Sequence, residues 1–349
     1  MHVLKLLGEL VATRSISGHE GAVAQLLSTW LRAHGIVFES IGDNVIARLR
    51  GREPGPTLLL NSHLDTVPAK GDWQRDPWSP SVEDGRLYGL GSGDAKASVA
   101  AMACAFRQLH ERGLERGSVI FAATVMEETG GGGLEHIVGD LGPLNAALIG
   151  EPTSLKAAVA QGGLMILEGT ARGVAAHAAR PWEGKNALEI AAQDLLSIHS
   201  TRFDRNHPLL QGTTATVTVL RGGDRHNVIP ATCEYTIDVR YTPAYSPDEI
   251  EALLRDRTQA ELCVRSRRLA PVETAADAGI VTALRSALPE LQLQGSPTMS
   301  DWVHLRHIDA VKIGPGDSAR SHTANESVAC AEVVRAVDLY RDTALALLE

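Results

Sequence analysis

The stretch TLLLNSHLDTVP, residues 57–68, joins an apolar run to a histidine and an aspartate that stand two residues apart. The run Thr57–Leu60 is typical of a buried strand, which then ends at His63 and Asp65. Such an ending suits two structures: a capped surface loop, or a metal ligand beside the residue that orients it. These two residues alone favour neither structure, so the choice depends on where the other polar residues fall.

The composition indicates a globular protein with a sizeable core. At 349 residues, with 44% hydrophobic and 21% charged residues, the chain suits two domains. The net charge of −9 is spread without acidic or basic runs, so we expect no binding to nucleic acid or to a membrane surface. The four cysteines share no CxxC spacing, which argues against disulfides and a thiolate zinc site. The first 15 residues predict an amphipathic helix rather than a signal peptide, and we expect a cytoplasmic protein.

The pattern of apolar residues changes along the chain. Residues 1–157 alternate strands and helices, with strands predicted at 44–48, 57–62, 118–125 and 146–150 and a long helix at 95–111. These apolar strands indicate a mostly parallel sheet covered by helices on both faces.

Residues 158–272 have a different character. Segments 164–173, 213–223 and 231–243 alternate apolar and polar residues, as half-exposed antiparallel strands do, and helices are predicted at 186–199 and 247–259. Residues 273–349 return to the first pattern, with a strand at 310–313. We therefore expect an α/β catalytic domain, residues 1–157 and 273–349, interrupted by a small α+β domain, residues 158–272.

Polar side chains gather where the predicted strands of the first domain end. In open α/β sheets the ligand crevice lies beyond the carboxyl ends of the strands. Any one of these residues is usually a solvated loop charge, but their joint arrangement is hard to obtain by chance. The residues are His63, Asp94, Glu127, Glu128, Glu151 and His322.

A divalent cation explains this combination of residue types. Carboxylates brought together repel one another unless a cation neutralises them. Histidine and oxygen ligands without cysteine suit Zn²⁺, with Co²⁺ or Mn²⁺ also possible. One carboxylate shared between two ions is typical of a two-metal hydrolase.

The chain resembles the M20 family of metallopeptidases in seven motifs, which run in family order across nearly its whole length. The resemblance implies a zinc-exopeptidase-like α/β/α catalytic domain with an inserted α+β lid domain, through which two copies form a homodimer. The motifs are NSHLDTVP, LYGLGSGDAKASVAAM, VMEETGGGG, IGEPT, GVAAHAARPWEGKNAL, HNVIPATCEYTIDVR and GPGDSARSHTANESV.

The resemblance also implies the ligands of two zinc ions per subunit. By motif position, His63, Asp94 and Glu151 would bind one ion. Asp94 would bridge to the second ion, which Glu128 and His322 complete.

Three further residues take roles that the resemblance implies. Asp65 would accept a hydrogen bond from the His63 imidazole and fix its orientation. Glu127 would be the general base that takes a proton from the attacking water and delivers it to the leaving amine. His177 would reach the active site of the partner subunit and polarise the scissile carbonyl, although taken alone it is equally explained as a histidine in a turn.

Asn227 and Arg240 resemble lid residues that contact the substrate. The fork of an arginine suits a substrate carboxylate because it binds both oxygens. A purely structural alternative is almost as well supported, because Arg240 has Asp238 and Glu234 on the same strand as possible ion-pair partners.

Two departures from the family pattern bear on the substrate. Many members carry GRG ahead of the bridging aspartate, whereas this chain has GLGSGDAK at residues 89–96. Desuccinylases carry an arginine pair where this chain has VAQGGLM, residues 159–165. The motifs are most similar to those of acetylornithine or N-acetylcitrulline deacetylases, so we expect hydrolysis of an N-acyl-α-amino acid of the arginine pathway.

Two alternatives stay open. One is another M20 hydrolase: a lysine-pathway deacylase acting on a carrier-linked amino acid, a desuccinylase or a dipeptidase. The other is a metal-binding scaffold without activity, which would have no need of Glu127 as a base.

Overall fold

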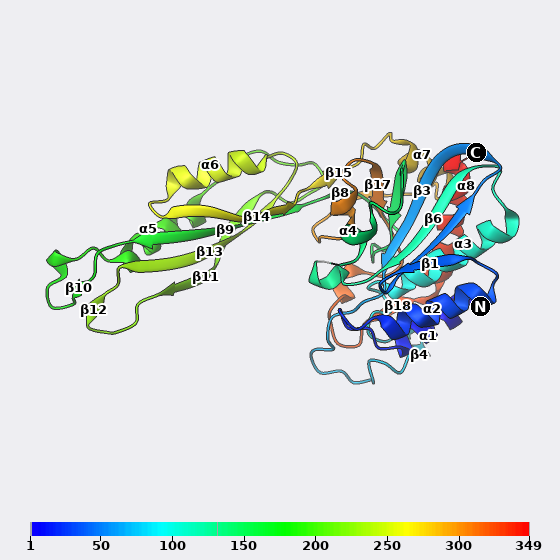
Figure 1. Ribbon diagram of the computed structural model, residues 1–349, viewed down its shortest axis with the longest axis horizontal. Helices are drawn as coiled ribbons and strands as arrows, with labels where there is room; N and C mark the ends of the chain where they lie inside the picture. The colour runs from blue at the N-terminus through cyan, green and yellow to red at the C-terminus, as the bar shows by residue number, and fades with distance from the viewer. Residues whose placement is uncertain (1, 131, 349) are drawn as a thin grey trace. The chain divides into compact units, whose positions relative to one another are not determined.

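The chain folds into two compact units in the computed structural model, which describes residues 2–130 and 132–348 (Figure 1). Unit 1 comprises residues 1–159, 273–294 and 300–349, and unit 2 comprises residues 160–272 and 295–299. From the sequence we expected the inserted domain to cover residues 158–272, without the short segment 295–299.

A nine-stranded mixed sheet forms the centre of unit 1, in the order β1-β2-β6-β3-β7-β17-β8-β15 with β16 beside β8. Its four central strands run parallel, so their carboxyl ends meet at one edge. These are β6 (Arg116–Thr124), β3 (Glu53–His63), β7 (Ala146–Ile149) and β17 (Asp309–Lys312). The outer strands are β1 (Phe38–Ile41), β2 (Asn44–Arg50), β8 (Ala157–Gln161), β15 (Val272–Glu273) and β16 (Leu293–Ser296).

The expected parallel sheet is therefore present in the centre but not at the edges. Strand β2 is antiparallel to both β1 and β6, and β8 is antiparallel to β17. Only Gly42 and Asp43 connect β1 to β2, and a two-residue connection joins antiparallel strands.

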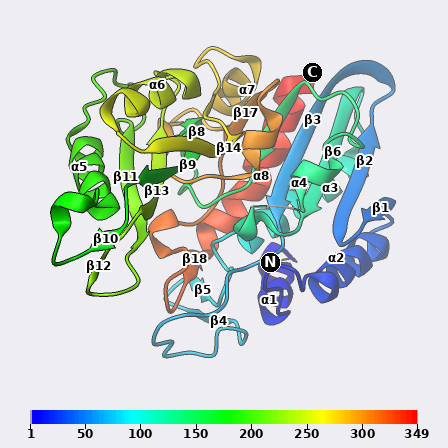
Figure 2. The same ribbon diagram turned by 60° about the vertical axis from the view of Figure 1, so that its left-hand side comes forward.

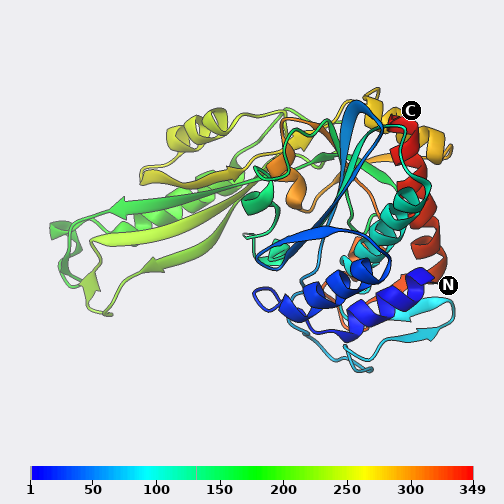
Figure 3. The ribbon, with the colours of Figure 1, turned by 45° about the vertical axis from the view of Figure 1, so that its right-hand side comes forward.

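Helices α3 and α8 pack against each other and against β3 and β6, with α1 on α3 and α7 on α8 (Figure 3). Every residue of α3 from Lys96 to Phe106 is buried, Cys104 included, and its many small side chains allow close packing against the sheet. The helices of unit 1 are α1 (His2–Ala12), α2 (Gly21–Ala33), α3 (Lys96–Arg112), α4 (Leu134–Ile137), α7 (Gly279–Ala287) and α8 (Cys330–Leu348). A small sheet joins β4 (Ser81–Glu83), β5 (Arg86–Tyr88) and β18 (Ser327–Ala329).

Unit 2 is a four-stranded antiparallel sheet in the order β11-β13-β9-β14, with α5 and α6 packed side by side against it (Figure 2). Burial alternates along β9 and β13, as the sequence pattern predicts. The Ser246 and Glu249 side chains form a capping box that begins α6. The elements are β9 (Gly163–Arg172), α5 (Ala187–Ser200), β11 (Thr214–Gly222), β13 (Thr232–Tyr241), α6 (Pro247–Arg257) and β14 (Glu261–Leu269).

These two units confirm the expected fold class, an α/β domain interrupted by an α+β domain. Among residues 2–130 and 132–348, no helix combines the length and apolar character that crossing a membrane requires.

Candidate metal centre

The parallel strands of unit 1 bring the predicted ligands to one edge of the sheet. His63 is the last residue of β3, and Glu151 follows β7 after one intervening residue, Gly150. Glu127 and Glu128 lie in a 3-10 turn just beyond β6. The other two come from loops: Asp94 precedes α3, and His322 follows β17.

His63 presents its two ring nitrogens to different neighbours. Its Nε2 atom lies 3.2 Å from Asp94 Oδ1 and 3.8 Å from Glu151 Oε1. Its Nδ1 atom lies 3.3 Å from Asp65 Oδ1, and the side chains of both His63 and Asp65 are almost fully buried, at 1% and 0% exposure. Asp65 therefore orients the ring, so that Nε2 faces the carboxylates of the other segments.

Asp94 divides its two carboxylate oxygens between two histidines. Oδ1 faces His63, whereas Oδ2 lies 3.6 Å from His322 Nε2. His322 Nε2 also lies 2.9 Å from the carboxylate of Glu128. One aspartate thus stands between a His63–Glu151 half and a His322–Glu128 half, the arrangement that a bridging ligand requires.

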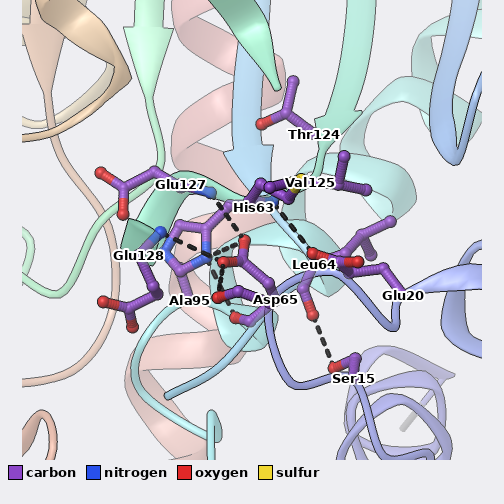
Figure 4. A network of polar contacts seen from close by, with 12 residues as sticks. Ser15, Glu20, His63, Leu64, Asp65, Ala95, Thr124, Val125, Glu127 and Glu128 are labelled. Atoms are coloured by element: carbon purple, nitrogen blue, oxygen red, sulfur yellow. Dashed lines mark hydrogen bonds and ion pairs between the residues drawn. The ribbon is translucent and has the colours of Figure 1, made fainter. Parts of the chain in front are cut away.

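Within the part of the chain that the structure describes, two sets of three side chains have ligand atoms within 4.8 Å of one another: His63, Glu127 and Glu151, and His63, Asp94 and Glu128. Glu127 and Glu128 are adjacent in sequence, yet Figure 4 shows their side chains extending to different sides. Met126 before them and Gly130 after them both adopt left-handed backbone conformations, with φ of 56° and 72°. This tight turn lets neighbouring glutamates belong to different sets.

Burial and the charges of neighbouring groups shift the pKa values of the acids in this cluster. Burial raises the pKa of Glu151 to about 7, an effect that the positive charges of Lys312 and His63 only partly offset. Burial and the Glu151 carboxylate raise the pKa of Glu127 well above its usual 4.5. Burial acts on Asp94 in the same direction, but its hydrogen bond and attraction to His63 hold its pKa below 3.8.

Neighbouring carboxylates raise the pKa of both histidines, which favours their charged form. Burial alone would lower the pKa of His63, but hydrogen bonds with Asp65 and Asp94 outweigh it and place the pKa well above 6.5. The hydrogen bond with Glu128 raises the pKa of His322 to about 9. The cluster therefore attracts positive charge, and imidazole with carboxylate is a donor set that fits a divalent cation such as Zn²⁺.

Lys312 and Asp301 are among the buried charged residues near the cluster that were not predicted. Lys312 lies on β17 and is 2% exposed, and its charge acts to lower the pKa of Glu151. Asp301 accepts a hydrogen bond of 2.9 Å from the Thr124 hydroxyl, and its charge acts to raise the pKa of Glu127. A signal was present for Lys312, because it is the one charged residue in the apolar strand segment 310–313.

The other predicted residues belong to unit 2. His177 and Asn227 meet there: the strand β10 (Ala176–His177) pairs with β12 (Val228–Ile229), and the Ala178 N–H donates to the Asn227 carbonyl oxygen at 3.0 Å. Both residues are exposed. The Ala179 N–H donates to His177 Nδ1 at 3.1 Å, so a neutral ring carries its proton on Nε2.

Arg240 forms an ion pair with Asp238, as the purely structural interpretation of this residue predicts. Its Nε and Nη2 atoms donate to the two oxygens of Asp238 at 2.8 and 3.1 Å. The same arginine lines a cavity of about 350 Å³ within unit 2, together with Gly162, Gly163 and Thr214. The side chain is 53% exposed, so the pairing with Asp238 leaves it accessible to a ligand.

The sequence matches the model of one protein family, Peptidase family M20/M25/M40, over residues 59–346. An acetylornithine deacetylase of Edwardsiella ictaluri is 34% identical over 269 residues, which cover 70% of this chain and 69% of the relative. A succinyl-diaminopimelate desuccinylase of Rhodospirillum centenum is 30% identical over 337 residues, which cover 88% of this chain and 86% of the relative.

Solved structures show the same fold. The aminopeptidase PepT of Bacillus cereus superposes with a TM-score of 0.80 at 21% identity, covering 99% of this chain and 98% of that one. The YXEP protein of Bacillus subtilis, described as a dinuclear metal-binding peptidase from the M20 family, superposes with a TM-score of 0.77 at 17% identity, covering 99% and 97%.

Proposed function

Because the chain belongs to peptidase family M20/M25/M40 and is a hydrolase, we propose that it hydrolyses the amide bond of an N-acyl-α-amino acid, with two zinc ions as cofactors. The single observation that carries this proposal is the placing of the Asp94 carboxylate between His63 and His322. A bridging carboxylate between two histidine-containing halves is the arrangement of two-metal hydrolases.

The residues that would hold the two ions are those of the two halves. His63 and Glu151 would hold one ion, His322 and Glu128 the other, and Asp94 would hold both. The ions, when bound, supply Lewis-acid chemistry that activates water and polarises the scissile carbonyl. Asp65 keeps the His63 ring oriented, with its Nδ1 side at 3.3 Å from the carboxylate.

Glu127 is the proposed general base. Its carboxylate lies close to His63 and Glu151, so a water molecule held by the proposed ligands would be beside it. Its raised pKa brings it closer to neutrality, where a group that must accept and then release a proton works best. Glu127 takes the proton of the attacking water and returns it to the amine of the leaving amino acid.

The proposal includes a homodimer formed through unit 2, in which His177 serves the active site of the partner subunit. Strand β11 is an edge strand with Val219 and Leu220 exposed, and an exposed apolar edge favours association with a second chain. The Nε2 proton of His177 is available to donate to the carbonyl oxygen as it gains charge. Asn227, beside it, is proposed to contact the same substrate.

Arg240 is proposed to bind the α-carboxylate of the substrate. Its fork already holds the Asp238 carboxylate through two nitrogens, the geometry by which an arginine binds a carboxylate ligand. Its place on the wall of a cavity supports this role.

Acetate is the proposed acid released, from a substrate of the N-acetylornithine or N-acetylcitrulline type. A succinyl group carries a second carboxylate, which needs a cationic partner when it binds. The segment 159–165 has no lysine or arginine to offer.

A desuccinylase is the second candidate, because several relatives carry that name at similar identity. A panel of N-acetylornithine, N-acetylcitrulline, N-succinyl-diaminopimelate and a free dipeptide separates the two, with release of the amine measured before and after zinc loading. We expect the acetyl substrates to be cleaved with the highest kcat/KM. Preferential cleavage of the succinyl substrate or of the dipeptide would overturn the assignment. A zinc-loaded protein inert on all four would favour the non-catalytic scaffold.

A further inference from the structure

Glu326 holds the loop that carries Asp94. This buried carboxylate, 2% exposed, accepts three backbone hydrogen bonds from that loop. Oε2 accepts the Gly91 N–H at 2.8 Å, and Oε1 accepts the N–H groups of Gly93 at 2.8 Å and Asp94 at 3.0 Å. The loop that carries the proposed bridging ligand is therefore held by both oxygens of one side chain.

The same segment of chain also carries His322. Glu326 follows His322 by four residues and directly precedes β18, which pairs with β5, the strand before the Asp94 loop. The Glu326 carbonyl oxygen accepts the Gly89 N–H at 3.0 Å, which adds a main-chain bond to the side-chain ones. Through Glu326 the positions of Asp94 and His322, whose side chains approach to 3.6 Å, depend on one another.

A second buried glutamate, Glu20, binds the backbone of the turn that carries Glu127 and Glu128. Glu20, which Figure 4 shows near Leu64 and Val125, is also 2% exposed. Its Oε1 atom accepts the Met126 N–H at 3.0 Å and the Gly18 N–H at 2.9 Å. Asp65 accepts the next two N–H groups, those of Glu127 and Glu128, at 3.1 Å each. The turn that presents the two glutamates thus has every backbone N–H from Met126 to Glu128 bound to a side-chain oxygen.

We infer that Glu20 and Glu326 are positioning residues, which fix the backbone of the two ligand loops so that Asp94, Glu127 and Glu128 are held in place before a metal ion binds. Burying a carboxylate is unfavourable unless strong hydrogen bonds compensate. The neutral side chain of Asn44 accepts the hydrogen bond of the preceding Val125 N–H at 3.1 Å. A charged side chain is therefore not required simply to accept the backbone hydrogen bonds of this turn. The inference rests on the proposed metal-dependent function and assigns residues outside the ligand set.

The hydrogen bonds make different predictions for the two glutamine variants. Glutamine keeps one carbonyl oxygen and gains an NH₂ group that only donates. Glu20 uses one oxygen for both bonds, so Glu20→Gln is expected to bind metal within about threefold of the wild type, whereas Glu20→Leu loses both bonds. Glu326 uses both oxygens, so Glu326→Gln sets an NH₂ group against at least one backbone N–H. We expect its zinc affinity to fall about 10–100-fold, the usual effect of removing a group that supports a ligand.

Asp194 provides a matched control in unit 2. It is a buried carboxylate that accepts the backbone N–H groups of Gln259 and Ala260 at 2.8 and 3.0 Å, on a segment that carries no proposed ligand. Asp194→Asn is expected to lower the thermal stability of the metal-free protein and to leave zinc affinity unchanged.

The experiment uses the full chain, with zinc affinity measured by competition with a chelator and the visible spectrum recorded after cobalt loading. We expect Glu326→Gln and Glu20→Leu to weaken affinity and to alter the cobalt spectrum, and Glu20→Gln to do neither. A wild-type affinity and spectrum in both Glu326→Gln and Glu20→Leu, with only the melting temperature lowered, would overturn the inference alone. A wild-type chain that binds neither zinc nor cobalt would overturn the proposed function and the inference with it.

Discussion

Most candidate residues of unit 1 are buried or half-buried and contact one another, with His322 the exposed exception, whereas those of unit 2 are all exposed. His63 and Asp65 are 1% and 0% exposed and contact one another, while Arg240 is 53% exposed and pairs with Asp238 on its own strand. A buried charge needs partners, and in the unit 1 cluster the histidines and carboxylates supply them for one another. Exposed residues are compatible with several functions, so the contacts within unit 2 give less information about the role of each residue.

This contrast separates two kinds of proposed residue. The proposed ligands and the proposed base are positioned by the fold of unit 1, and substituting them should change chemistry or metal content. The substrate-contacting residues of unit 2 are proposed to act only when substrate and a partner subunit are present, and substituting them should leave metal content unchanged.

The largest effect is expected from Glu127→Ala. Removal of the proposed base should lower kcat about 10²–10⁴-fold, with zinc content measured by elemental analysis unchanged. Glu128→Ala is the matched neighbour, and it should lose zinc because it removes a ligand. If Glu127→Ala loses zinc and Glu128→Ala keeps it, the roles of the two glutamates are reversed.

His177→Ala comes next. Removing one donor to the developing oxyanion should lower kcat about 10²–10³-fold while zinc content stays at the wild-type value. His199→Ala, which removes an exposed histidine of α5, is the control and should have wild-type kinetics. Unchanged turnover in His177→Ala would show that His177 has only a structural role in the turn after β10.

A smaller effect is expected from Arg240→Lys. Lysine keeps the charge but not the bidentate fork, so KM should rise about tenfold with kcat nearly unchanged, since one charged hydrogen bond contributes about 1.5–3 kcal/mol. Arg265→Lys, at an exposed arginine of β14, is the control. Equal KM values in the two variants would show that Arg240 serves only its pair with Asp238.

An effect of similar size concerns pH and tests unit 1 alone. His322, whose pKa is raised to about 9 by Glu128, must release its proton before it binds a metal ion. Protons therefore compete with zinc below pH 9, and affinity should rise about tenfold per pH unit from pH 7 to 8 through this group. Chelator competition at the two pH values measures the change, and an affinity that falls as pH rises would contradict it.

The sequence was sufficient to predict which strands end at the candidate site. The apolar run that stops at His63 predicts both the buried part of β3 and the residue at which the strand ends. Because β3 is a parallel strand, its carboxyl end lies at the edge of the sheet where ligands bind. The half-exposed alternation of residues 164–173 likewise predicted a strand of unit 2, observed as β9, Gly163–Arg172.

The supporting contacts of the site were beyond the reach of sequence patterns. Nothing local distinguishes Glu20 from a solvated surface acid, and although Glu326 stands in the last of the seven motifs, no pattern there shows that it binds the Asp94 loop. Their burial and their backbone partners emerge only once the strands are paired. The partner of Arg240 was likewise open between Asp238 and Glu234 until the side-chain geometry favoured Asp238.

The dependence of hydrolysis on two metal ions can be tested by following turnover of N-acetylornithine during stepwise return of zinc to the chelator-treated chain. We expect no turnover without metal and a rise that levels off at two zinc ions per chain. Turnover that survives complete removal of metal would contradict this dependence.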